Sequence, residues 1–331
     1  MKLAAVVDVN PDAARAFGDS FNCSSYTSLD DYLACGNPAD CGLICTPSCE
    51  HTEIACSLMQ RRIHVLCELP FALNSASAER MIDVSRAYGV SLMMASKLRF
   101  VPDLLHARGL IQAGILGQVL EFEADFRDPV DMRNRWNIRR DISGGGVLID
   151  SGSFTLDIAR YFFGPILGVR VEEGWRIQSE DVEDTVRLAL RTDSGVLGTA
   201  HLSWTLKNPG DEYLRIYGTQ GNLCIGWKKS MYRPNGAIDW INFGEGYSTQ
   251  KATTLLMKHF INCIAGDELP EIDAEDALES VRVIETAYKS LLSGRFLNIH
   301  PEQASAEALL TKSQKLSVIH SEPTFPAWIF K

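Results

Sequence analysis

The chain has 331 residues, with 32 Lys and Arg residues against 42 Asp and Glu residues, so its formal net charge is −10. This length suits about two domains of ordinary size. An acidic chain without a basic stripe is unsuited to nucleic acid, and no apolar run approaches the ~18 residues that a membrane-spanning helix needs. The composition therefore predicts a globular protein that binds neither nucleic acid nor a membrane.

The chain has nine cysteines, an odd number that predicts free thiols in a reducing cytoplasm rather than a secreted disulfide framework. Cys41, Cys45 and Cys49 are four residues apart, whereas zinc knuckles use a two-residue spacing, and no Cys/His pair completes the set. We therefore expect no metal site.

The first ninety residues alternate short apolar runs with helical segments. Residues 3–7 form a continuous β-prone run, which is typical of a strand covered on both faces. Further strands are expected at residues 41–46, 63–67 and 91–95, with helices between them that begin after the capping residues Asn10, Ser28 and Asn74. Strands that alternate with helices favour a doubly wound parallel sheet.

The pattern changes after about residue 98. One helix is predicted over 102–113, and period-two strands follow at 119–126, 169–175, 185–191, 196–204 and 213–217. Turns such as 192–195 join them and predict a large, mainly antiparallel sheet, with helices at 147–163 and 273–293. We expect a Rossmann-like α/β domain over 1–97, an α+β domain over 98–297 and a tail over 298–331.

Several short motifs occur in one order along the chain. They are Cys45-Thr46-Pro47 with His51, the run from His64 to Pro70, Arg99-Phe100-Val101-Pro102, Gly114-Ile115-Leu116-Gly117, the run from Gly144 to Ser153 with Asp157, and Tyr217-Gly218-Thr219-Gln220-Gly221. In this order the chain resembles the Gfo/Idh/MocA family of NAD(P)-dependent sugar and polyol oxidoreductases, over residues 1 to about 297.

The resemblance implies a nicotinamide cofactor at the carboxyl ends of the first strands. Asp8 matches the acidic residue that holds the adenosine ribose hydroxyls, and because a carboxylate there repels a 2′-phosphate, NAD is favoured over NADP. The alternative is an ordinary Asp at a strand end. Thr46, Pro47 and His51 match the loop along the pyrophosphate and nicotinamide ribose, although a histidine at a helix start also serves as a cap. Glu68 matches the acidic residue of the Glu-Lys-Pro motif and is assigned to the cofactor site.

The resemblance also implies a substrate site for a sugar or polyol. Asp150 matches the acidic residue that faces the substrate, and Asp157 lies on the same helix face, where it either contacts substrate or makes a structural hydrogen bond. Arg135 and Trp136 lie in a donor-rich segment that either lines the substrate or forms an exposed loop. Lys97, at the end of the fourth strand, either reaches the site or is solvated. Asp150 and Lys97 are the candidate catalytic residues.

The chain departs from the family pattern at three places that bear on catalysis. The family opens with a strand and Gly-x-Gly-x-x-Gly, a unit of roughly thirty residues that this sequence does not contain. Because that strand is central in the sheet, we expect an incomplete first domain with exposed backbone donors and apolar faces. Leu69 stands at the lysine of Glu-Lys-Pro and Phe154 at the expected histidine, so the usual proton route is absent.

Three hypotheses remain open at this point. The protein is an NAD-dependent enzyme whose front was lost to a wrongly chosen start codon, or a catalytically silent homologue that binds a sugar-like ligand or pairs with an active relative. The third is a pseudogene product that does not fold stably. Self-association into a homo-oligomer through a helix-free sheet face is expected, as in the family.

Overall fold

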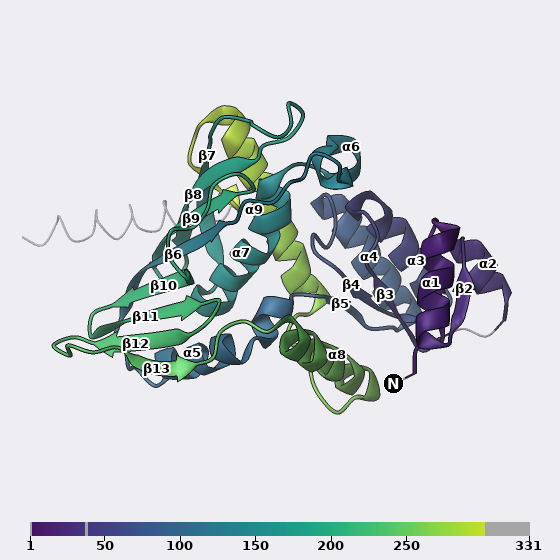
Figure 1. Ribbon diagram of the computed structural model, residues 1–331, viewed down its shortest axis with the longest axis horizontal. Coiled ribbons are helices and arrows are strands. Elements are labelled where there is room, and N and C mark those ends of the chain that lie inside the picture. Colours follow the sequence, from purple (N-terminus) through teal and green to yellow (C-terminus); the bar gives the residue numbers. More distant parts are fainter. Residues whose placement is uncertain (1, 37–38, 302–331) are drawn as a thin grey trace, which may run out of the picture.

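The computed structural model describes residues 2–36 and 39–301, and its amino-terminal half shows the expected alternation of strands and helices (Figure 1). The strands are β1 Ala5–Val7, β2 Ser24–Tyr26, β3 Cys41–Ile44, β4 His64–Cys67 and β5 Leu92–Met94, and the helices are α1 Pro11–Phe21, α2 Leu29–Ala34, α3 His51–Gln60 and α4 Ser75–Tyr88. Asn10, Ser28 and Asn74 accept hydrogen bonds from first-turn amides of α1, α2 and α4. The predicted caps are therefore confirmed.

The five strands of this half form two separate parallel sheets. β1 pairs with β2, and β3, β4 and β5 form a second sheet in that order. Among the described residues, nothing pairs with the second edge of β1 or of β3. The elements beside these edges expose Leu3, Phe17, Phe21 and Leu43 by 46 to 59%. Unpaired strand edges and exposed apolar side chains are what the sequence led us to expect here.

The carboxyl-terminal half is built on one nine-stranded sheet. Its strands are β6 Val119–Arg127, β7 Ile166–Glu173, β8 Thr185–Thr192, β9 Leu197–Ser203, β10 Glu212–Gly218, β11 Gly221–Gly226, β12 Ser230–Pro234, β13 Ile241–Gly244 and β14 Leu297–Asn298. The order is β13-β12-β11-β10-β6-β9-β8-β7-β14, and all neighbours are antiparallel except β6 and β9. The mainly antiparallel sheet is confirmed. The strands β11 to β13 were not predicted, because Gly221, Gly226 and Pro234 read as turn residues.

Four longer helices accompany this sheet: α5 Pro102–Gln112, α7 Val147–Phe163, α8 Thr249–Ala265 and α9 Ala274–Ser293. Figure 1 shows α7 and α9 between the large sheet and the amino-terminal half. The bounds of α7 and α9 agree with the predicted helices. The sequence reading missed α8, although Ala252, Leu256 and Phe260 are buried at four-residue intervals, which is the signal of an amphipathic helix.

The core of the amino-terminal half includes side chains from helices α8 and α9, which come late in the sequence. Leu256 and Phe260 of α8, together with Ala277, Leu278 and Val281 of α9, are buried in one cluster with the side chains of β3 to β5, α3 and α4. The first 97 residues, predicted as one domain, therefore share their core with two helices that are far away in sequence.

The sheet face that points away from α7 and α9 carries charged side chains. On β8, Val186, Leu188 and Leu190 are buried, whereas Arg187 between them is exposed and pairs with Glu172. This alternation is that of a half-buried strand. Self-association through this face stays a prediction. The pair of Arg187 and Glu172 makes this part of the sheet face ionic rather than apolar.

The predicted tail begins inside the sheet. Asn298 pairs with Gly168 of β7, and Ile299 is buried, so the boundary at residue 298 was wrong by at least two residues. The register of β14 could not be predicted because two residues are too few for a periodic pattern. Residues 302–331 lie outside the described part of the chain.

Candidate active site

Three strand ends bring together the candidate residues of the amino-terminal half. Thr46 follows β3, Glu68 follows β4, and Lys97 begins the short 3-10 helix η2 Lys97–Phe100 after β5. Because these strands are parallel, their carboxyl ends meet at one edge, where ligands bind in such sheets. Lys97 Nζ lies 3.1 Å from Glu68 Oε1, so this lysine is held by an ion pair and is half-buried rather than freely solvated.

Thr46 presents a polar group that has no protein partner. Its Oγ1 is buried and makes no hydrogen bond with any described residue. A buried hydroxyl without a partner is costly, and a ligand hydroxyl would satisfy it. Pro47, which precedes the 3-10 helix η1 Ser48–Glu50, has a φ of −56° and fixes the direction of the loop. The ribose contact of Thr46 and Pro47 stays a prediction.

His51 has a different role from the predicted one. The side chain is buried, with Nε2 2.9 Å from the Thr46 carbonyl and Nδ1 3.0 Å from the Pro70 carbonyl. Burial lowers the pKa of His51, and the two carbonyl oxygens oppose that shift. Both ring nitrogens face main-chain carbonyls, and the single N–H of the neutral imidazole donates to one of the two, between the β3–η1 loop and the β4–α4 loop. His51 supports the shape of the loop and offers no free nitrogen to a cofactor.

Asp8 lies just after β1 and is exposed. Its Oδ1 accepts a hydrogen bond from Asn10 N at 2.8 Å, and Asn10 in turn caps α1. One carboxylate oxygen therefore remains open to solvent, in a position that suits a ribose hydroxyl. The roles of Asp8 and Thr46 towards the sugar parts of NAD stay predictions, and the described residues offer no glycine-rich turn for its pyrophosphate.

Asp150 belongs to the carboxyl-terminal half and lies in the first turn of α7. Trp204, which follows β9, donates from its indole Nε1 to Asp150 Oδ2 at 3.1 Å. Burial raises the pKa of Asp150, while the Trp204 hydrogen bond and the charge of Arg135 oppose the shift. A carboxyl group with a raised pKa is better suited to exchange protons near neutral pH than an ordinary aspartate. Trp204 was not predicted, since a single aromatic residue at a strand end carries no sequence signal.

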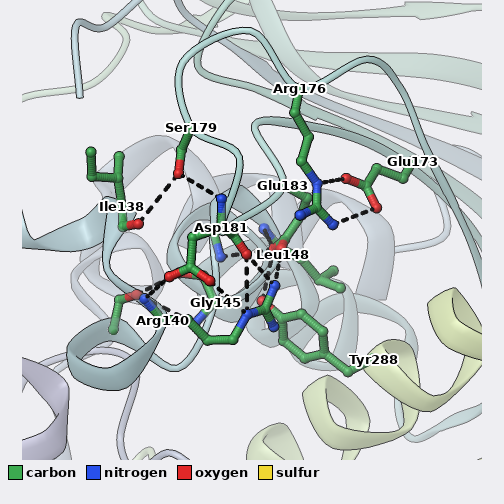
Figure 2. Close-up of polar contacts among 12 residues, drawn as sticks. Ile138, Arg140, Gly145, Leu148, Glu173, Arg176, Ser179, Asp181, Glu183 and Tyr288 are labelled. Atoms are coloured by element: carbon green, nitrogen blue, oxygen red, sulfur yellow. Dashed lines mark hydrogen bonds and ion pairs between the residues drawn. The ribbon is translucent and has the colours of Figure 1, made fainter. Parts of the chain in front are cut away.

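The glycine run before α7 is required by close packing. A Cβ at Gly146 would lie 1.8 Å from the Glu183 carbonyl oxygen, and a Cβ at Gly145 would lie 1.8 Å from the Tyr288 hydroxyl. Gly144 has a φ of +83°. Figure 2 shows this region, where Glu183 and Tyr288 meet the start of α7. The motif thus allows Glu183 to approach the helix start.

Leu69 and Phe154 occupy the two positions at which the family pattern has proton-transferring residues. Leu69 is half-buried against the core of the amino-terminal half. Phe154 packs edge-on against Phe126, with ring centroids 4.9 Å apart. Neither side chain can exchange a proton, so any acid–base chemistry must use another group.

Asp157 is fully buried and does not line an open site. It receives hydrogen bonds from Arg99, including one of 2.9 Å from Arg99 Nε, and from Ser96. Arg99 also donates to Asp276 of α9 at 2.6 Å. This geometry agrees with the structural hydrogen bond and argues against the substrate contact that we assigned to Asp157. The arginine of η2 thereby connects the two halves through α7 and α9.

Arg135 and Trp136 lie in the exposed segment before α7. Trp136 begins the 3-10 helix η3 Trp136–Ile138 and is 38% exposed. Arg133 is engaged by Asp131 at 2.7 Å, whereas the Arg135 side chain has no ion pair or hydrogen bond with any described residue. Arg135 is close enough to influence Asp150 electrostatically, and its substrate role stays a prediction.

The described cysteines are free thiols, Cys41, Cys45 and Cys49 among them. Within residues 2–36 and 39–301, no group of three His, Cys, Asp or Glu side chains is arranged to hold a metal ion. In the same part of the chain, no helix combines the length and the apolar character of a membrane span.

Two family models match the chain. The one described as "Oxidoreductase family, NAD-binding Rossmann fold" matches residues 1–96, and the "GFO/IDH/MocA C-terminal domain" matches residues 104–224. Myo-inositol 2-dehydrogenase of Thermotoga maritima is 25% identical over 310 residues, which cover 90% of this chain and 91% of that protein.

Solved structures show the same arrangement. The aldose–aldose oxidoreductase from Caulobacter crescentus, complexed with glycerol, has a TM-score of 0.82 at 23% identity and covers 90% of this chain and 91% of that chain. The WlbA dehydrogenase from Bordetella pertussis, in complex with NADH and UDP-GlcNAcA, has a TM-score of 0.75 at 25% identity, with 90% of each chain covered. Together the two family models match well over half of the sequence, and the chain belongs to the Gfo/Idh/MocA family of oxidoreductases.

Proposed function

We propose that this protein transfers a hydride between NAD and a secondary alcohol of a sugar or polyol, with Asp150 as the proton acceptor. The observation that carries the proposal is the Asp150 carboxyl, which lies in the first turn of α7, accepts the Trp204 indole proton and has a pKa raised by burial. The related myo-inositol 2-dehydrogenase and the UDP-GlcNAcA complex of the WlbA dehydrogenase support the choice of substrate class.

The chemistry requires that an alcohol loses a hydride from carbon and a proton from oxygen. NAD, when bound, would supply the hydride acceptor. Asp150 takes the hydroxyl proton, and its raised pKa makes that transfer more favourable than it would be for an ordinary aspartate. Trp204 donates to one oxygen of the carboxylate and leaves the other oxygen for the substrate. The products are a carbonyl compound, the reduced cofactor and protonated Asp150, so atoms and charge balance.

Lys97 is the second catalytic candidate. Its ammonium is held by Glu68 at the strand ends. In this proposal it donates a hydrogen bond to a substrate oxygen. The loss of the motif lysine at Leu69 leaves Lys97 as a cation in this part of the site. Asp8 and Thr46 hold the riboses in this proposal, and Asp8 favours NAD over NADP because of its charge.

A second candidate function is that of a catalytically silent homologue that binds a sugar-like ligand or pairs with an active relative. It is favoured by Leu69 and by the packing of Phe154 against Phe126, which together remove the usual proton route. Binding without turnover would identify it.

The experiment combines a binding and a turnover measurement on the full chain. NADH binding is followed by fluorescence, and a panel of sugars and polyols, myo-inositol first, is assayed with NAD. Turnover that Asp150→Asn and Lys97→Ala both reduce supports the enzyme. NADH and polyol binding without turnover supports the silent homologue, and no NADH binding contradicts the proposed function.

A further inference from the structure

Two neighbouring buried carboxylates lie beside the Asp150–Trp204 pair. We propose that Glu183 and Asp184, at the start of β8, are the positioning residues that hold Asp150 and Trp204 in contact. This inference rests on the proposed role of Asp150 as proton acceptor.

Glu183 holds the helix that carries Asp150. Its Oε1 accepts hydrogen bonds from Gly146 N at 2.9 Å, Leu148 N at 3.2 Å and Tyr288 Oη at 2.7 Å (Figure 2). Its main-chain oxygen accepts Val147 N at 2.8 Å. Helix α7 has no side-chain cap of its own at Gly146, so Glu183 satisfies the amides that the helix start leaves free.

Burying the Glu183 carboxylate at the start of α7 costs more free energy than an ordinary helix cap does. Glu183 is 0% exposed, and its Oε2 has no hydrogen-bond partner among the described residues. The nearest cation is Arg140, with Nη2 4.0 Å from Glu183 Oε2, and that nitrogen is already bonded to the Asp181 carbonyl. A short polar residue caps an ordinary helix without burying a charge. At the start of α7 a short polar residue cannot take the capping position, because any Cβ at Gly146 would collide with Glu183.

Asp184 holds the other partner. Its Oδ2 accepts Ile177 N at 2.6 Å and Gln178 N at 2.8 Å, and its main-chain oxygen accepts Trp204 N at 2.9 Å. Gln178 Nε2 then donates to the Trp204 carbonyl at 2.8 Å. The main-chain oxygen of Asp184 thus holds the Trp204 amide, and its carboxylate fixes Gln178. Gln178, together with Val130 N at 2.9 Å, holds the Trp204 carbonyl, while the indole reaches Asp150.

The two carboxylates thus control one distance, that between the Trp204 indole and the Asp150 carboxylate. The indole hydrogen bond lowers the pKa of Asp150, and the charge facing Asp150 is that of Arg135, which acts in the same direction. If the helix start moves, Asp150 loses the indole donor while Arg135 stays on its own loop. The titration of Asp150 therefore reports whether Glu183 positions it.

The test is an NMR titration of the full-length protein with 13C-labelled aspartate and 15N-labelled tryptophan, with Asp150 assigned through Asp150→Asn and Trp204 through Trp204→Phe. In Glu183→Ala, which removes the acceptor of the Gly146 and Leu148 amides, the Asp150 midpoint is expected to rise by about half a pH unit or more, because the charged form loses the indole hydrogen bond. The Trp204 indole resonance is expected to move towards that of a free indole. Tyr288→Phe keeps the Glu183 carboxylate and its contacts to α7, and should leave both signals in place.

A lower melting temperature with an unchanged Asp150 midpoint and indole resonance would show a merely structural cap and would overturn the inference. Ser290→Ala, which loses hydrogen bonds on α9 away from this pair, controls for a general loss of stability. If Glu183→Ala does not fold, Asp184→Ala, which removes the acceptor of the Ile177 and Gln178 amides, decides in its place, with the same expected rise and the same contrary result. Because no turnover is needed, a failed activity assay cannot be confused with a failed positioning role.

Discussion

The two halves of the molecule differ in how their sheets are completed. In the amino-terminal half, strands of three or four residues form two separate parallel sheets with unpaired edges. In the carboxyl-terminal half, nine strands form one hydrogen-bonded sheet with helices on its apolar face. The cofactor candidates Asp8 and Thr46 lie on the small sheets, and Asp150 and Trp204 lie beside the large one. The difference teaches that the proposed site would depend on two sheets of unequal stability.

Native-state hydrogen exchange should show this difference as the largest effect. Amides of β1 and β2 are expected to exchange on the order of a thousandfold faster than those of β8 and β9, because short strands paired on one side open locally without global unfolding. Mass spectrometry of peptides from both regions measures the ratio. Equal protection in the two halves would contradict the comparison.

The second largest effect is expected from a substitution at the junction between the halves, where Arg99 contacts Asp157. Asp157→Asn is expected to lower the free energy of unfolding by about 3 kcal/mol, because it leaves the buried Arg99 guanidinium with an incomplete set of acceptors. Urea denaturation measures the loss. Glu53→Gln, which breaks the exposed Arg80–Glu53 pair, is the matched control and should leave the midpoint almost unchanged. An equal effect of the two substitutions would show that the junction is not a structural link.

Asp150→Asn should affect turnover without affecting the cofactor side. We expect kcat to fall about a hundredfold, as for the loss of a general base, with an unchanged Kd for NADH. Steady-state kinetics and fluorescence titration measure the two quantities. A weakened NADH affinity would contradict the proposal that the amino-terminal half binds the cofactor while Asp150 transfers the proton.

The pH dependence follows from the raised pKa of Asp150. Turnover should fall as acid protonates Asp150, with a midpoint above the ordinary value of 3.8. Because the folded pKa exceeds the unfolded one, this group's contribution to stability is fully present below the unfolded pKa and is lost as pH rises through the folded pKa. Asp150→Asn should therefore melt slightly above the wild type at neutral pH. A lower melting temperature would show that the carboxylate stabilises the fold.

Thr46→Val should give the smallest effect. The hydroxyl has no protein partner, so the free protein should lose no stability, while NADH affinity is expected to fall about tenfold through the loss of one hydrogen bond. Calorimetric titration and a thermal melt measure both. Thr253→Val on α8 is a control threonine away from the strand ends. Unchanged NADH affinity would remove Thr46 from the cofactor site.

Much of the fold could be predicted because its signals are local. Asn10 followed by Pro11 marks a helix start by chemistry that needs no partner, and the predicted bounds of α7 were correct. The parallel pairing of β6 with β9 was not predictable, because it joins strands that are separated by two others in sequence. Register between distant strands depends on the packing of the whole sheet.

The candidate site could be predicted only where a motif supplied it. Asp150, Glu68 and Thr46 came from motif positions, and the structure places two of them at parallel strand ends. Trp204 and Glu183 were missed because their importance lies in contacts across 54 and 35 residues of sequence. The contacts of His51 with two backbone carbonyls could not be predicted, because backbone groups leave no trace in the sequence.

The shared core of the amino-terminal half has a consequence for synthesis on the ribosome. Ala277, Leu278 and Val281 of α9 are buried with the side chains of β3 to β5, yet they are translated some 180 residues after β5. At typical elongation rates this interval lasts roughly 10 to 40 s. During that time the nascent first half exposes the surface that α9 later covers, so chaperones that bind apolar segments have a long window in which to act.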